Sequence, residues 1–100
     1  MNKSFALVFL VTCLNLTAIA GDKIKGAALY KACIECHGAD GMGKKLKEAP
    51  SLKGQYDWYI LTQLKAFKSK ERKNPKMDPF IKALSYEDFA DLAAYISTME

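Results

Sequence analysis

Apolar side chains recur at helical spacing in three stretches of this chain, and the clearest stretch lies near the C-terminus. Five of them share one stripe of a helix there, at i, i+3, i+4, i+7 and i+10: Phe89, Leu92, Ala93, Ile96 and Met99. Ser85 and Asp88 precede the stripe and resemble a capping box, with aspartate in place of the usual glutamate. The pattern predicts a helix that begins just after Ser85 and buries one face.

A first helix is predicted over residues 22–33. Its apolar side chains gather on one side, and Asp22 is placed to cap the first turn. Gly26 lies inside this helix, where glycine lowers helix stability. We therefore expect another backbone to approach closely at Gly26.

A second helix is predicted over residues 57–69, where apolar side chains lie at helical spacing. Glycine and proline break any periodic pattern over residues 38–54, and a polar segment with Pro75 follows at residues 70–77, so both are predicted to be loops. Asp78 and Pro79 then resemble a cap and a first-turn proline, so a short helical turn is predicted through Ala83. No run alternates as a strand does, so the predicted fold class is all-α, with three main helices plus a short helical turn.

The N-terminal segment resembles a secretory signal peptide. Lys3 is followed by an apolar run over residues 5–16 and then by an Ala-Ile-Ala sequence of the small-x-small type that precedes a cleavage site. The run is shorter than the roughly 20 apolar residues that a membrane-spanning helix needs. We expect a signal peptide over residues 1–20, cleaved after Ala20, and one domain over residues 21–100 with no retained membrane anchor. An uncleaved anchor is the alternative.

Charge and size narrow the possible functions. The chain carries 15 basic and 11 acidic side chains, and loss of Lys3 with the signal peptide leaves a formal charge of +3. The basic residues are not interleaved with aromatic ones as in a nucleic-acid-binding surface, so no nucleic acid is expected as a partner. A domain of 80 residues buries little apolar surface and ordinarily needs disulfides, a metal or a large cofactor.

The motif that carries chemistry consists of Cys33, Cys36 and His37, in the sequence Cys-Ile-Glu-Cys-His. Two thiols at this spacing can form thioether bonds with the two vinyl groups on one edge of a haem, and the adjacent histidine can bind the iron. Covalent attachment of haem outside the cytoplasm also suits the predicted export signal. The motif predicts one covalently attached haem c per chain, with His37 as an axial ligand.

Two other uses of these cysteines fit the chain poorly. A structural zinc site needs four ligands, whereas residues 21–100 offer two cysteines and one histidine. A thioredoxin-like dithiol belongs in a βαβ setting, and the pattern predicts no strand. Haem attachment is therefore the interpretation that accounts for the motif.

Three methionines of the predicted domain are candidates for the sixth iron ligand. Met42 follows His37 by only five residues, and Met99 belongs to the last apolar stripe, where a packing role is expected. Met77 lies in a polar loop 40 residues after His37, far enough along the chain to cover the opposite face. A thioether is a soft, neutral ligand that raises the reduction potential. Met77 is the predicted ligand, and Met42 or an open site remain the alternatives.

The chain resembles the class I, single-haem cytochromes c, especially the short bacterial type, over nearly all of residues 21–100. The resemblance rests on short motifs around the cysteines, in the following loop and in the helices: Gly26, Tyr30, Cys33, Cys36, His37-Gly38-Ala39-Asp40-Gly41, Ala49-Pro50-Ser51-Leu52, Gly54, Gln63-Leu64, Phe67, Arg72, Met77, Leu84-Ser85, Asp88 and Leu92-Ala93-Ala94-Tyr95. It implies a cytochrome c fold in which the first and last helices cross near Gly26, with Tyr30 and Tyr95 close to the contact.

The same resemblance implies the details of the site. The carbonyl of Pro50 is expected to accept the proton of the His37 imidazole and so orient the ring. Met77 corresponds to the family's methionine ligand. Three aromatic residues are expected to pack in the core or against the haem: Tyr56, Trp58 and Tyr59.

We therefore expect an exported, monomeric one-electron carrier in the periplasm rather than an enzyme, working between respiratory or dehydrogenase partners. Its iron is expected to cycle between Fe(III) and Fe(II) with His37 and Met77 as axial ligands. The lysines are interpreted either as solvated surface or as a rim that steers redox proteins with acidic docking surfaces. Two other classes stay open: a gas-binding or peroxidatic haem protein, and an electron-entry subunit bound to a larger dehydrogenase or oxidase.

Overall fold

The structure, a computed structural model, describes residues 4, 6, 8, 10 and 21–100. The predicted signal peptide over residues 1–20 therefore lies outside the described residues, apart from four isolated positions. Among the helices of the described part, none is long and apolar enough to cross a membrane.

The described domain begins with an α-helix that continues into a 3₁₀ turn and a second short α-helix. Asp22 caps α1 (Lys23–Tyr30), because its carboxylate accepts hydrogen bonds from two amides of the first turn. The helical path continues through a 3₁₀ turn, η1 (Lys31–Cys33), and the short helix α2 (Ile34–His37). The predicted start is confirmed. The predicted end at residue 33 is wrong, because the helical path continues until Gly38, with φ of 84°, ends it.

The following segment is a loop, as predicted, but it contains local order that glycine and proline spacing does not reveal. A 3₁₀ turn, η2 (Lys45–Lys47), is closed by an isolated antiparallel bridge between Lys44 and Ala49. Glu48 takes a left-handed conformation at the end of this turn, with φ of 53°. Since backbone amides form the bridge, the side-chain pattern gives no signal for it.

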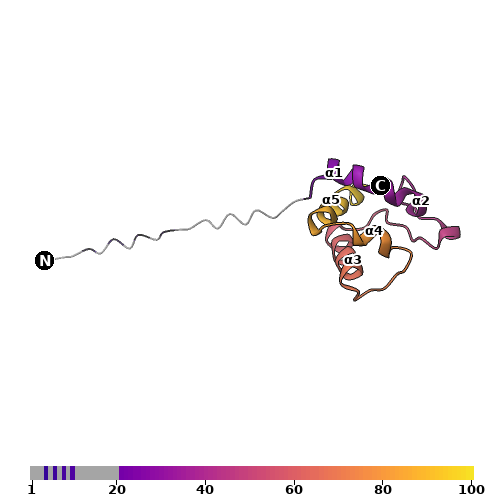
Figure 1. Ribbon diagram of the computed structural model, residues 1–100. Coiled ribbons are helices and arrows are strands. Elements are labelled where there is room, and N and C mark those ends of the chain that lie inside the picture. The colour runs from indigo at the N-terminus through magenta and orange to yellow at the C-terminus, as the bar shows by residue number, and fades with distance from the viewer. Residues whose placement is uncertain (1–3, 5, 7, 9, 11–20) are drawn as a thin grey trace.

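Three further helices complete the fold (Figure 1), namely α3 (Asp57–Ser69), α4 (Asp78–Lys82) and α5 (Tyr86–Ile96). α3 has the predicted bounds. α4 carries Pro79 in its first turn, and its N-cap is Met77, one residue earlier than we predicted. Met77 makes no side-chain cap, and the proline supplies a backbone angle suited to the helix start.

α5 has the predicted capping box. The Ser85 hydroxyl accepts a hydrogen bond from the amide of Asp88 at 3.1 Å, and the Asp88 carboxylate accepts one from the amide of Ser85 at 2.9 Å. The helix ends at Ile96, so Met99 lies beyond it but still packs against the core. The packing role expected for Met99 is confirmed.

α1 crosses α5, and this is the most extensive contact between helices among the described residues (Figure 1). A Cβ atom added at Gly26 would lie 2.0 Å from the carbonyl oxygen of Asp91 and 2.8 Å from the Cβ of Tyr95. The close approach expected at Gly26 is therefore confirmed. Tyr30 and Tyr95 pack beside it, with ring centroids 5.4 Å apart.

The core lies between α1, α3, α4 and α5, and its buried members are Tyr30, Ile60, Leu64, Phe67, Ile81, Phe89, Leu92, Ala93 and Ile96. The aromatic residues at the start of α3 are not among them, since Tyr56, Trp58 and Tyr59 are exposed. The prediction that these three could lie in the protein core is wrong, because they precede the buried stripe of α3. Their alternative role against a haem stays a prediction.

Candidate haem site

His37 is almost fully buried at the end of α2, with 5% of its surface exposed. Its Nδ1 lies 2.9 Å from the carbonyl oxygen of Pro50. Because a carbonyl can only accept, Nδ1 carries a proton in this contact, and the tautomer with its single proton on Nδ1 has a lone pair on Nε2. Within the described residues, Nε2 has no hydrogen-bond partner. A histidine oriented in this way is prepared to bind a metal through Nε2.

The approach of Pro50 to His37 depends on a glycine that the sequence reasoning treated only as a loop former. The amide of Gly43 donates to the carbonyl of His37 at 2.7 Å. Its φ is 80°, and an added Cβ would lie 2.5 Å from the carbonyl oxygen of Ala49 and 2.6 Å from the carbonyl carbon of Pro50. Only glycine fits there, so Gly43 allows the loop to fold back onto the histidine.

Tyr30 holds the backbone directly after His37 in place. Its hydroxyl donates to the carbonyl of Gly38 at 2.6 Å, in buried surroundings. Burial raises the pKa of Tyr30 to about 12, so the phenol stays a hydrogen-bond donor at neutral pH. Tyr30 was predicted at the helix contact, but this hydrogen bond was not predicted. Tyr30 precedes His37 by seven residues, about two helical turns, and that spacing is the available signal.

Cys33 and Cys36 are free thiols, each half-buried. They lie at i and i+3 along a helical path, which places both on one side of it. Burial, with a smaller contribution from Cys36, raises the pKa of the Cys33 thiol. Cys33 also packs against the core, so its position is fixed by the fold.

Met77 and Met42 differ in their surroundings. Met77 is half-buried and packs against the core, and its amide donates to the carbonyl of Asn74 at 3.1 Å. Met42 is 55% exposed. Met77 is thus a thioether held on an ordered turn at the start of α4.

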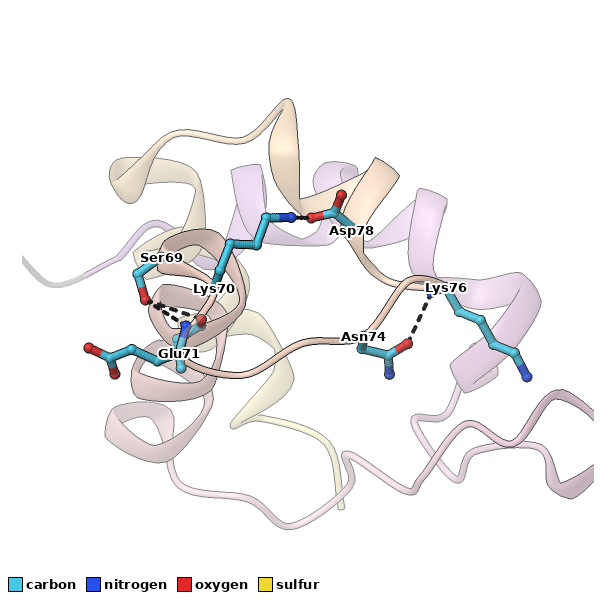
Figure 2. A network of polar contacts seen from close by, with 7 residues as sticks. Ser69, Lys70, Glu71, Asn74, Lys76 and Asp78 are labelled. Atoms are coloured by element: carbon cyan, nitrogen blue, oxygen red, sulfur yellow. Dashed lines mark hydrogen bonds and ion pairs between the residues drawn. The ribbon is translucent and has the colours of Figure 1, made fainter.

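Polar contacts fasten the loop that leads into α4 (Figure 2). Lys70 and Asp78 form an ion pair across it, and the Asn74 side chain accepts a hydrogen bond from the amide of Lys76 at 3.0 Å. The ammonium group of Lys76 lies 2.9 Å from a carboxylate oxygen of Glu48, which follows η2. This hydrogen bond lowers the pKa of the Glu48 carboxyl. Exposed ion pairs add little stability. Together with the Asn74 hydrogen bond, however, these two ion pairs connect the loop over residues 70–78 to itself and to Glu48.

The donor groups fit a covalently attached c-type haem. Two free thiols, a buried imidazole with a free Nε2 and a thioether on an ordered loop are the groups that such a cofactor requires. Within the described residues, no group of three or more histidine, cysteine or acidic side chains could hold a bare metal ion.

The sequence model described as cytochrome c matches residues 24–100 of this chain. The chain is 39% identical over 84 residues to cytochrome c-554(548) of Halomonas halodenitrificans, covering 81% of this chain and 100% of that protein. It is 43% identical over 68 residues to the "thiosulfate dehydrogenase electron acceptor" of Stutzerimonas stutzeri, covering 68% of this chain and 32% of that protein.

A solved structure agrees with the sequence comparisons. The cytochrome c4 of Acidithiobacillus ferrooxidans superposes with a TM-score of 0.71 and 33% identity, over 82% of this chain and 52% of that chain. The chain thus spans about half of this cytochrome c4 and about a third of the thiosulfate dehydrogenase electron acceptor.

These matches confirm the all-α cytochrome c fold. Together with the motif of Cys33, Cys36 and His37, they imply a covalently attached haem c. Cytochromes c are electron carriers and not enzymes. The match begins at residue 24, so the boundary predicted after Ala20 stays a prediction. Since the family model matches residues 24–100 and the fold agrees, the chain belongs to the cytochrome c family, as a class I member that transports electrons.

Proposed function

We propose that this protein is an exported, monomeric carrier of single electrons in the periplasm, with one covalently attached haem c. In this proposal residues 21–100 form the mature domain after cleavage behind Ala20. The observation that carries it is the 2.9 Å hydrogen bond from His37 Nδ1 to the Pro50 carbonyl, beside two free thiols. The haem, when bound, supplies an iron centre that alternates between Fe(III) and Fe(II).

Each residue of the site has a distinct role in this proposal. Cys33 and Cys36 hold one haem edge through thioether bonds, so the cofactor cannot dissociate. His37 and Met77 would be the two protein ligands of the iron, and Pro50 would fix the ring orientation and tautomer of the histidine. Because the chain would supply both ligands, water and small molecules would be kept from the metal, as outer-sphere electron transfer requires.

Replacement of Met77 by alanine is expected to leave the haem attached and to open the sixth coordination position. The ferrous variant is then expected to bind carbon monoxide, and the methionine-to-iron charge-transfer band of the ferric form is expected to disappear. Absorption spectra of the exported protein, oxidised and reduced, with and without carbon monoxide, measure both changes.

The matched control is Met42→Ala, which removes the same side chain at an exposed position. Its spectra are expected to equal those of the parent. Unchanged spectra in Met77→Ala would remove Met77 from the site, and carbon monoxide binding by Met42→Ala would make Met42 the ligand. Binding of carbon monoxide by the unsubstituted protein would favour a gas-binding or peroxidatic function instead.

Redox proteins with acidic docking surfaces, dehydrogenases among them, are the partners that we propose. The relative named as an electron acceptor of thiosulfate dehydrogenase supports a dehydrogenase as electron donor. The surface beside the attachment motif is basic, since Lys44 and Lys45 are exposed and Lys47 lies 3.6 Å from Glu35, a residue of the motif. Stable co-purification with a dehydrogenase would indicate a bound subunit rather than a free carrier.

Charge reversal at Lys44 and Lys45 together is expected to slow electron transfer from an acidic probe protein, flavodoxin hydroquinone, by roughly tenfold at low salt. The difference is expected to shrink between 0.01 and 0.1 M salt, where the Debye length falls from about 30 to about 10 Å. Stopped-flow kinetics measure the second-order rates.

The matched control for this pair is the double charge reversal of Lys23 and Lys25, which are exposed on α1. It changes the net charge equally and is expected to have a much smaller effect on the rate. Equal slowing by both double variants would show that net charge decides the rate. Reduction by ascorbate, a small monoanion, is expected to slow much less than reduction by flavodoxin in either double variant.

A further inference from the structure

Asp91 is a carboxylate buried where α5 meets α1, with 6% of its surface exposed. Its Oδ1 accepts a hydrogen bond from the amide of Asp22 at 2.7 Å. Among the described residues, no side-chain cation pairs with it. A buried carboxylate is ordinarily compensated by a cation or by several hydrogen bonds, because its charge loses the stabilisation that water gives. Among the described residues, Asp91 has one neutral donor and no cationic partner, so a cation beside it would stabilise its charge further.

Gly21 packs against the same turn of α5. A Cβ added at Gly21 would lie 1.9 Å from the carbonyl oxygen of Ala90 and 2.8 Å from the amide nitrogen of Asp91. Only glycine fits in this position. The nitrogen of Gly21 is three covalent bonds from the nitrogen of Asp22, so the two atoms lie within roughly 4 Å of each other. The fold therefore holds the Gly21 nitrogen near the Asp91 carboxylate.

We propose that Asp91 is the binding site for the chain's own terminal ammonium group. Cleavage after Ala20 adds water across the Ala20–Gly21 peptide bond, leaving a carboxylate on Ala20 and a primary ammonium on Gly21. Before cleavage the Gly21 nitrogen is a neutral amide, and afterwards it is a cation beside a buried carboxylate. Processing thus supplies the cationic partner that Asp91 lacks and strengthens the attachment of α1 to α5.

Asp22 uses one oxygen of its own carboxylate for another purpose. Its Oδ1 caps α1 by accepting hydrogen bonds from the amides of Ile24 and Lys25, at 2.9 and 3.3 Å. In the full-length chain, Gly21 already packs against α5 although Ala20 precedes it in the sequence. A retained residue before Gly21 therefore does not prevent this packing, and the change on cleavage is one of charge.

Four holoproteins test the proposal: chains that begin at Gly21 or at Ala20, each with and without Asp91→Asn. Asparagine keeps an oxygen for the Asp22 amide and removes the charge. Retention of Ala20 is expected to lower Tm by about 4–8 °C when Asp91 is present, and by less than half as much in the Asp91→Asn background. Equal losses in both backgrounds, or no loss in either, would overturn the proposal.

Chemical labelling gives a second test that does not depend on the stability of the Asp91→Asn variant. Acetylation of the Gly21 amine by N-hydroxysuccinimidyl acetate, followed by mass spectrometry, is expected to be several-fold slower in the folded protein than in the unfolded protein. Equal rates in the two states would contradict pairing with Asp91. A different first residue in the exported protein would also overturn the proposal, while the spectra that test the electron carrier would be unaffected.

Discussion

Replacement of His37 by alanine is expected to abolish accumulation of mature, haem-containing protein. The substitution removes the imidazole whose Nε2 is free for iron and whose Nδ1 is fixed by Pro50 at 2.9 Å. Loss of an outer partner of a metal ligand already lowers metal affinity by about 10–100-fold, so loss of the ligand itself is expected to lower holoprotein yield by at least roughly tenfold. Haem staining and absorption spectra of the exported fraction measure the yield.

Tyr30→Phe is the matched control for His37→Ala. It removes a hydroxyl that donates to the carbonyl of Gly38, the residue after His37, at 2.6 Å, while that carbonyl keeps the Gly41 amide at 3.2 Å. The expected cost is therefore about 0.5–1.5 kcal/mol of unfolding free energy, with haem content unchanged. The control thus separates a general loss of stability in this segment from loss of the ligand. Normal yield of correctly coordinated His37→Ala protein would contradict the axial role.

The helices that the sequence predicted well are those whose signals are local. The stripe and capping box of α5 lie within one segment, so the sequence alone locates its start at Ser85. The end of the first helical stretch was predicted too early because α2 (Ile34–His37) is a single short turn, in which apolar spacing gives little signal. Gly38 was the better signal, since glycine with positive φ is the residue that most often ends a helix.

The residues of the site likewise include some with a local sequence signal and some without one. The thiols and His37 form one short motif, so residue spacing was enough to predict haem attachment. The bond from His37 to Pro50 spans 13 residues of irregular loop, and only the family resemblance indicated it. The bond between Asp22 and Asp91 spans 69 residues. No periodic pattern predicts such a contact, because it depends on how two complete helices pack.

Gly26→Ala is expected to cause a large loss of stability, although alanine favours helices over glycine by about 1 kcal/mol. The added Cβ would lie 2.0 Å from the carbonyl oxygen of Asp91 and 2.7 Å from its carbonyl carbon. These are backbone atoms, so no side-chain rotation relieves the overlap and α1 must move away from α5. The expected net loss is about 3 kcal/mol, near the upper end for overpacking. Tm is expected to fall by roughly 12–24 °C.

Ala28→Leu is the matched control for Gly26→Ala, since it adds more volume at an exposed position of the same helix. Its Tm is expected to stay within about 4 °C of the parent. Thermal unfolding of the oxidised holoproteins, followed by circular dichroism, compares the two. A higher Tm for Gly26→Ala would show that helix propensity outweighs the contact and that α1 and α5 do not cross so closely. A large fall in Tm with normal haem content would show that the loss of stability arises at the contact between α1 and α5 and not from poorer haem attachment.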